Sequence, residues 1–353
     1  MAKRISVVIS QGQSQNPAKQ ALEEDLVAGL LMEPGIDVTV IPHLYDLKPD
    51  GTGMLALHGI KGPLIVISWL FERAAHWILD RNDIGGREGL SLIRHEDEDE
   101  QDDESGESKE AIKDRVIDHR DLPDRKIYCI DLRVHKTAQP YIDEVKRIAV
   151  ENNTEVVQLG KWIQGDPQPE QMQRFLNPGA RPAVEGNGTS NEPPIATRIQ
   201  EEPSRRWYPV IDFSRCTNCM ECIDFCLFGV YGVDRNETIL VEQPDNCRKG
   251  CPACSRVCPE NAIIFPQHKA PTIAGSSVVA EGLKIDLSKL FGAPDAGKSA
   301  VEIAALERDE QLLMAGREAV GMTVGIAKRQ TGKQQEPRDE LDNLIDELDE
   351  LDL

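Results

Sequence analysis

The first 165 residues alternate short apolar runs with segments of helical periodicity. From residue 17 to 32, apolar side chains recur at the steps of one helix face, and we expect further helices near 71–79 and 140–150. Runs rich in β-branched or other apolar residues predict strands at 5–10, 37–41, 63–69, 126–133 and 155–159. Because strands alternate with helices, we expect an α/β domain over residues 1–165, with a parallel sheet and helices on both faces.

Other segments differ from this pattern in composition. Ten of the fifteen residues from Glu96 to Glu110 are acidic, and like charges at this density oppose packing, so we expect a disordered insertion at about 95–110. Residues 177–205 are rich in Pro, Gly, Asn and Glu, which is typical of a linker. Residues 269–353 are expected to be a partly helical, largely disordered acidic tail, with its helix near 300–314.

The end of the tail carries an apolar stripe on an acidic background. Leucine or isoleucine recurs at three- and four-residue steps, at Leu341, Leu344, Ile345, Leu348 and Leu351. Because a short isolated helix is marginal in water, we expect residues 338–353 to be disordered in the free protein. Two interpretations stay open for this segment: docking into a groove of a partner, or a tail that only solubilises the chain or folds back on it.

Charge and composition exclude several classes of partner. The 353-residue chain has 40 basic and 61 acidic side chains and a net charge of −21, which argues against nucleic-acid binding and against docking on anionic membranes. No apolar run approaches the ~20 residues of a membrane span. The apolar run from Ile5 to Ile9 is short for a signal-peptide core, so we expect a cytoplasmic protein with reduced thiols.

Eight of the nine cysteines lie within an expected second domain, residues 207–268, and form an internal repeat of two runs. The first run is Cys216, Cys219, Cys222 and Cys226, and the second run is Cys247, Cys251, Cys254 and Cys258. The last three positions of the runs are offset by 32 residues and the first by 31, so one extra residue precedes Cys251. In a reducing compartment, this density of cysteines indicates metal ligation rather than disulfides.

The spacing within each run suits a cubic iron–sulfur cluster. Three cysteines at two-residue gaps form a tight loop whose thiolates converge on three corners of one cube, and the fourth starts a helical turn that points toward the other cube. We therefore expect two ligand sets. The first thiol set is Cys216, Cys219, Cys222 and Cys258, and the second thiol set is Cys226, Cys247, Cys251 and Cys254.

Residues 207–266 resemble the bacterial-type ferredoxins with two [4Fe–4S] clusters, because eight cysteines at these spacings are a specific motif. The resemblance implies the ferredoxin-like cluster fold, low-potential one-electron transfer and the same exchange of the fourth ligand. Two features depart from the family pattern. Leu227 replaces the proline that usually ends the run, although Pro259 is present in the second run, and the loop before Cys251 is one residue longer. Gly250 can absorb that residue with a positive φ.

Other metal arrangements stay open. The longer loop makes a three-iron cluster at the Cys247 site an alternative. Two zinc sites would also use eight cysteines, but zinc sites take paired Cys-x-x-Cys knuckles from two loops, which these runs do not offer. The ninth cysteine, Cys129, falls in a predicted strand and is expected to be a small buried side chain.

Two loops have features of phosphate-binding segments. Residues 10–17 join the first strand to the first helix, where α/β folds bind phosphates. The domain order resembles proteins that fuse a flavodoxin-like domain to a two-cluster ferredoxin, which implies FMN at this loop. The loop has one glycine, Gly12, and three glutamines in place of a hydroxyl- and glycine-rich sequence, so FMN binding and a plain scaffold both stay open. Residues 292–299 match the P-loop letters without its buried strand, and we expect no nucleotide binding there.

These features predict an iron–sulfur electron-transfer protein. A flavodoxin-like α/β domain would be joined to a module whose two [4Fe–4S] clusters exchange single electrons with a redox partner protein. Two alternatives stay open. In the first, the N-terminal domain is a flavin-dependent reductase fed by the clusters, and in the second the chain is an assembly subunit whose clusters are structural. We assign no catalytic residue from the sequence.

Overall fold

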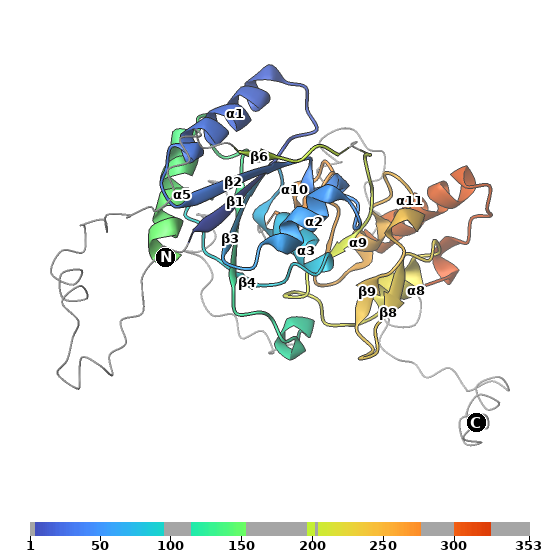
Figure 1. Cartoon of the computed structure of the whole chain (residues 1–353). Coiled ribbons are helices and arrows are strands. Elements are labelled where there is room, and N and C mark those ends of the chain that lie inside the picture. The colour runs from blue at the N-terminus through green and yellow to red at the C-terminus, as the bar shows by residue number, and fades with distance from the viewer. Residues whose placement is uncertain (1–3, 95–113, 153–195, 202–203, 277–299, 326–353) are drawn as a thin grey trace, which may run out of the picture. The chain divides into compact units, whose positions relative to one another are not determined.

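The computed structural model describes residues 4–94, 114–152, 196–201, 204–276 and 300–325 (Figure 1). The chain divides into two compact units, each described here by itself. Unit 1 comprises residues 1–69, 86–95 and 123–203, and unit 2 comprises residues 70–85, 96–122 and 204–353. The predicted insertion, the strand expected at 155–159, the loop 292–299, the tail segment 338–353 and most of the predicted linker lie outside the described residues.

Unit 1 is built on a six-stranded parallel sheet with the order β4-β5-β3-β1-β2-β6. The strands are β1 (Ile5–Ser10), β2 (Ile36–Ile41), β3 (Leu64–Ser68), β4 (Arg87–Glu88), β5 (Lys126–Asp131) and β6 (Thr197–Arg198). In the centre, Val7 of β1 lies beside Val38 of β2 and Ile65 of β3. Nearly continuous apolar runs suit these strands, because a parallel sheet is buried on both faces. The order β2-β1-β3-β5 is consistent with a flavodoxin-like fold.

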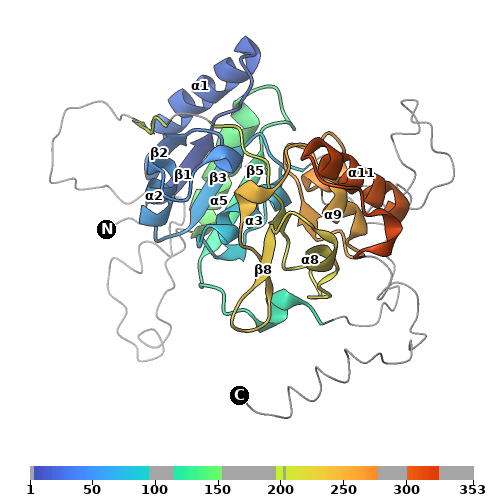
Figure 2. The same cartoon turned by 90° about the vertical axis from the view of Figure 1, so that its right-hand side faces the viewer.

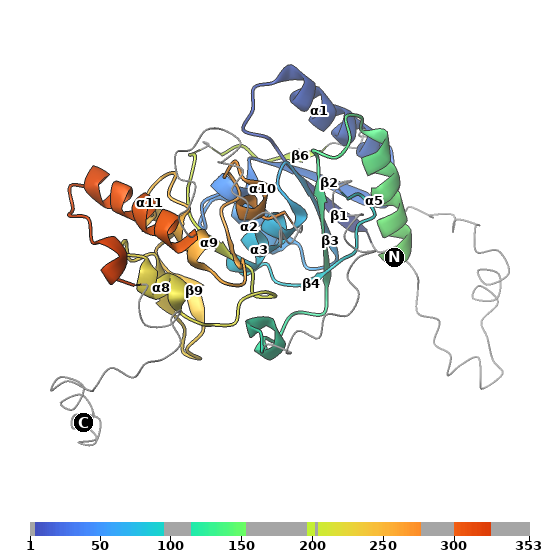
Figure 3. The same cartoon turned by 180° about the vertical axis from the view of Figure 1, so that it is seen from behind.

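Helices cover both sides of this sheet. Helices α1 (Pro17–Leu31) and α5 (Gln139–Asn152) share one side, and α2 (Thr52–Gly59) lies on the other side (Figures 1 and 3). Residues from α1, α5 and the strands form one hydrophobic core, in which Leu26, Val145 and Ile67 are fully buried. Asn16 caps α1 by accepting the N–H of Ala18 at 3.0 Å, and Pro17 begins the helix.

Helix α2 and strand β6 are among the elements of unit 1 that the sequence pattern does not indicate. Helix α2 begins Thr-Gly, a poor start by helix propensity, but the carboxylate of Glu201 accepts the N–H of Gly53 at 3.1 Å and so satisfies an open donor of its first turn. Strand β6 lies within the segment predicted to be a linker, and pairs Thr197 with Thr39 of β2. Both features depend on residues near 200 returning to the sheet edge.

Unit 2 contains the cysteine runs and two small antiparallel sheets. Strand β7 (Val210–Ile211) pairs with β10 (Ile263–Ile264), and β8 (Tyr231–Val233) pairs with β9 (Ile239–Val241). The unit also contains short helices: η2 (Val116–His119), α8 (Glu221–Phe225), η3 (Pro244–Asn246), α9 (Ala253–Val257) and α10 (Pro271–Ala274). The longer α11 (Ala300–Met314) occupies the segment predicted to be helical, and η5 (Gly321–Thr323) follows it.

Helix α3 (Glu72–Arg81) also belongs to unit 2, although it directly follows β3 in the chain. Its Trp77 packs edge-on against Phe213, with the ring centroids 5.7 Å apart. Residues 96–122, which include η2, are part of unit 2 as well. The unit that holds the cysteine runs therefore takes two segments from the first half of the sequence.

Candidate metal centre

The two cysteine runs have the same local structure. In each run the third cysteine lies on a five-residue helix, α8 or α9, and the fourth cysteine caps the end of that helix. The backbone N–H of Cys226 donates to the carbonyl of Cys222 at 3.1 Å, and Cys258 donates to Cys254 at 3.2 Å. The repeat seen in the sequence is thus a repeat of loop and helical turn.

The first thiol set is brought together from both runs. Burial is the main cause that raises the pKa of Cys216 to about 11, and the neighbouring Cys258 and Cys219 contribute in the same direction. Burial also raises the pKa of Cys222, with added contributions from Cys258, Cys216 and Cys219. The fourth cysteine of the second run therefore lies within electrostatic reach of the first three cysteines of the first run.

The second thiol set is arranged in the same way around a small apolar cavity. This cavity has a volume of about 20 Å³, and its lining includes Cys226, Cys247, Cys251 and Cys254. Burial raises the pKa of Cys254, with Cys226, Cys247 and Cys251 acting in the same direction. Cys226 thus faces the second run although it ends the first.

The enlarged loop keeps Cys247 with this set. Gly250 takes a φ of +89°, the left-handed conformation expected for it, and a Cβ there would meet no atom within 4 Å. Burial raises the pKa of Cys247, and Cys251 and Cys226 raise it further. The extra residue therefore lengthens the loop without turning Cys247 away from the cavity.

A single metal ion and a cubic cluster require different arrangements of the thiols. Within the described residues, no group of three or more Cys, His, Asp or Glu side chains is placed to hold one metal ion. The ligands of a cube bind different iron atoms, so their sulfurs need not meet at one point. Because burial favours the neutral thiols, loading such a site must displace protons as the thiolates form.

Hydrogen bonds to the sulfur atoms come from residues that the cysteine spacing does not reveal. The buried hydroxyl of Tyr231 donates to Sγ of Cys254 at 3.1 Å, and the N–H of Ala262 donates to Sγ of Cys258 at 3.3 Å. Such bonds stabilise negative charge on sulfur and tune the potential of a cluster. Tyr231 lies in β8, outside both cysteine runs, and nothing in the sequence around it indicates a contact with Cys254.

A segment from the first half of the chain covers the loop of the first thiol set. The N–H of Val116 donates to the carbonyl of Cys216 at 2.9 Å, and the N–H of Ile117 donates to that of Phe213 at 3.1 Å. The side chain of Arg115 donates to the carbonyl of Ser214 at 2.8 Å. Val116 is buried in the same core as the cysteines. This segment follows the predicted acidic insertion, and the sequence pattern did not connect it with the cysteines.

An ion pair lies under the same loop. Arg73 of α3 pairs through Nε with the carboxylate of Asp212, and its guanidinium also donates to the carbonyl of Asn261. The carbonyl of Asp212 accepts the N–H of Cys216 at 2.9 Å. The side chains of Arg73 and Asp212 are only 9% and 1% exposed, so this pair joins α3 to the first cysteine loop away from water.

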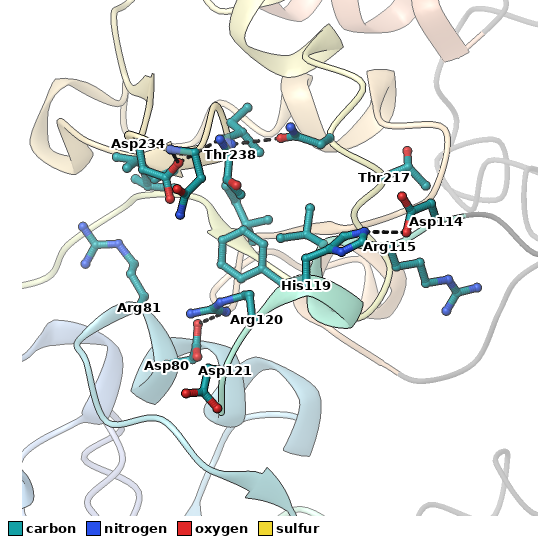
Figure 4. A pocket seen from close by; sticks show the side chains of 18 of the residues that line it. Asp80, Arg81, Asp114, Arg115, His119, Arg120, Asp121, Thr217, Asp234 and Thr238 are labelled. Atoms are coloured by element: carbon teal, nitrogen blue, oxygen red, sulfur yellow. Dashed lines mark hydrogen bonds and ion pairs between the residues drawn. The ribbon is translucent and has the colours of Figure 1, made fainter. Parts of the chain in front are cut away.

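A polar cleft of about 1000 Å³ lies beside the first thiol set (Figure 4). Thr217 and Asn218, which separate the first two cysteines, contribute to its lining. Arg120 and Asp80 form a 2.8 Å ion pair on one side, and Asp234 lies across from them (Figure 4). The cleft gives the first ligand loop a face that is open to solvent.

In unit 1, the loop of residues 10–17, for which FMN binding and a plain scaffold both stayed open, is closed by side chains from outside it. The carboxylate of Glu23 accepts the N–H of Gly12 at 2.8 Å and Nε1–H of Trp69 at 2.7 Å. A Cβ at Gly12 would lie 3.0 Å from the Trp69 ring. The N–H of Gly12 therefore already binds an anionic group, where a bound phosphate would need it. FMN binding and a plain scaffold both stay open for this loop.

Glu23 should make the stability of unit 1 depend on pH. Burial raises its pKa above 4.5, although the N–H groups of Gly12 and Trp69 lower it. For an acid with a raised pKa, stability is full below the unfolded value and is lost as pH rises through the folded value. We expect wild type to lose stability relative to Glu23→Gln between pH 4 and neutral pH, as measured by hydrogen exchange of β1 amides. Asp25→Asn, on the exposed face of α1, is the control, and a pH-independent difference would contradict the prediction.

Comparisons with known proteins bear on part of the chain. It is 52% identical over 66 residues, 18% of its length, to an uncharacterized ferredoxin of Methanocaldococcus jannaschii, of which the match covers 44%. It is 37% identical over 59 residues to the pyruvate synthase subunit PorD of the same organism, covering 66% of that protein. Over 87 residues, 24% of the chain, it is 33% identical to PorD of Methanothermobacter marburgensis, which is matched along its whole length.

Other searches add no further relatives. No family model matches the chain, and no solved structure matches it significantly. Among the described residues, none of the helices combines the length and apolar character needed to cross a membrane. The similarity to a ferredoxin and to two PorD proteins supports a ferredoxin module within this chain. Through this module, the chain belongs to the family of ferredoxin-like proteins that includes pyruvate synthase subunit PorD.

Proposed function

We propose that this protein carries two [4Fe–4S] clusters and exchanges single electrons with a redox partner. The observation that supports this most directly is the pairing of the runs. Each thiol set combines three cysteines of one run with the fourth of the other, with Cys258 joining the first set and Cys226 the second. Bacterial-type two-cluster sites use this exchange of the fourth ligand.

The residues around each thiol set have distinct tasks in this proposal. When bound, a [4Fe–4S] cube takes up or releases one electron. Unit 2 buries four of the ligands and partly buries the other four, and the hydroxyl of Tyr231 and the N–H of Ala262 stabilise charge on sulfur. The cleft beside Thr217 and Asn218 leaves one edge of the first site accessible, as electron exchange with a second protein requires.

The relatives support a protein partner of a particular kind. Two of them are named as subunits of pyruvate synthase, which favours a partner that is itself an oxidoreductase. Residues 338–353 remain a candidate docking segment for such a partner, and a cytoplasmic location remains a prediction.

We expect anaerobically purified full-length protein to contain about eight iron and eight sulfide atoms per chain. Its visible absorption should bleach on addition of dithionite and return on reoxidation, because a carrier must cycle. Flavin analysis of the same sample tests the reductase alternative. Clusters that are present but cannot be reduced would support a structural role, and zinc in place of iron and sulfide would reject the proposal.

A further inference from the structure

Helix α11 and the turn after it cover the second thiol set. The helix packs against α9 (Figure 2), and its Ala304 belongs to the hydrophobic core that contains the cysteines. After the helix the chain turns back, and Gly325 packs so closely on α8 that a Cβ there would lie 2.7 Å from the carbonyl oxygen of Asp224. This cover lies against the helical turn that ends in Cys226.

Arg308 of α11 places a positive charge inside this covered site. The residue is 1% exposed and contributes to the lining of the cavity formed by the second thiol set. Its guanidinium lies 4.5 Å from the ring centroid of Phe225 and donates to the carbonyls of Gly321 at 2.6 Å and Val324 at 2.9 Å. These contacts hold the guanidinium in one position. The group also stays charged, because arginine remains protonated in proteins.

The charge of Arg308 lies beside a ligand and has one carboxylate next to it. Arg308 and the ligand Cys251 both line the cavity of the second thiol set. Nε of Arg308 lies 3.3 Å from Oδ1 of Asp309, whose Oδ2 accepts the N–H of Gly321 at 2.7 Å. The other nearby acid, Glu307, is paired with Arg256 at 2.9 Å. Asp309 is therefore the carboxylate that acts as the counter-charge of Arg308.

We propose that Arg308 raises the midpoint potential of the cluster held by the second thiol set, an inference that rests on the proposed function. Each one-electron reduction adds a negative charge within the cavity. A fixed cation in a weakly polarisable interior stabilises that added charge more than it stabilises the oxidised state. Arg308 thus contributes to a difference in potential between the two sites.

The test is a redox titration of Arg308→Gln, followed by electron paramagnetic resonance of the reduced clusters. We expect the equilibrium constant for reduction of one cluster to fall about tenfold, which is about 59 mV for one electron, while the other cluster keeps its potential. Arg308→Lys should retain most of the wild-type potential because it keeps the charge. Arg317→Gln is the matched control, since this exposed arginine donates to the carbonyl of Leu227 at 2.8 Å from outside the cavity.

Asp309→Asn gives a second test of opposite sign that does not depend on the folding of the Arg308 variants. Asparagine can still accept the N–H of Gly321, but it removes the counter-charge, so the same potential should rise. Unchanged potentials in both Arg308→Gln and Asp309→Asn, with full iron content, would overturn this inference and leave the proposed function standing. Wild-type protein without two reducible clusters would instead refute the proposed function.

Discussion

Replacing Cys226 by alanine is expected to remove the cluster of the second run and to leave the cluster of its own run assembled. In the structure, Cys226 lies in the cavity with Cys247, Cys251 and Cys254, although it is only four residues from Cys222. The iron content should therefore fall from about eight to about four atoms per chain. Cys129→Ala is the control and should keep about eight, because this cysteine lies in β5 of unit 1.

Two double variants decide which cluster is lost. If the fourth ligands are exchanged, Cys222→Ala with Cys226→Ala damages both sites and leaves almost no iron. Cys226→Ala with Cys254→Ala then damages only one site and leaves about four atoms. If each run holds its own cluster, these two results are reversed. Both proteins lack two cysteines, so a general loss of stability would lower the iron content of both and cannot imitate either pattern.

Replacing Arg73 by methionine is expected to destabilise unit 2 by about 3–5 kcal/mol, because it leaves the carboxylate of Asp212 buried without its cation. Asp212 also accepts the N–H of Ser214 at 2.9 Å, and its carbonyl accepts the N–H of Cys216. The loss should therefore extend to the first cysteine loop. Arg73→Lys should recover part of the stability. A lysine restores the positive charge beside Asp212 but lacks the second N–H group that Arg73 donates to the carbonyl of Asn261.

Hydrogen exchange of the Asp212 amide measures this effect within unit 2, because that N–H donates to the carbonyl of Ala262 at 2.8 Å. The matched control is Asp114→Asn, which breaks a 2.8 Å pair with His119 between side chains that are 78% and 71% exposed. We expect that change to cost less than about 1 kcal/mol. Equal protection in Arg73→Met and wild type would show that the ion pair does not hold α3 to the cysteine loop.

Local sequence patterns anticipated much of the regular structure. The strands expected at 5–10 and 126–133 correspond to β1 and β5, and the helices expected at 17–32 and 300–314 correspond to α1 and α11. These elements have apolar residues repeated at the period of their own backbone, and that period is visible within one window of sequence. Helix α2 and strand β6 were missed, because Glu201 and the edge of β2 support them from distant positions.

The sequence by itself determined the ligands that we propose, because cysteine spacing is dictated by how a short loop can surround a cube. It also indicated that Gly250 takes a positive φ to accommodate the longer loop. Only the tertiary structure decided which other residues surround the thiols. Arg73, Val116 and Arg308 lie between 57 and 143 residues from Cys216 or Cys251 in the chain, and no local period links them to the cysteines. Their role depends on burial and charge, which arise only when distant segments pack together.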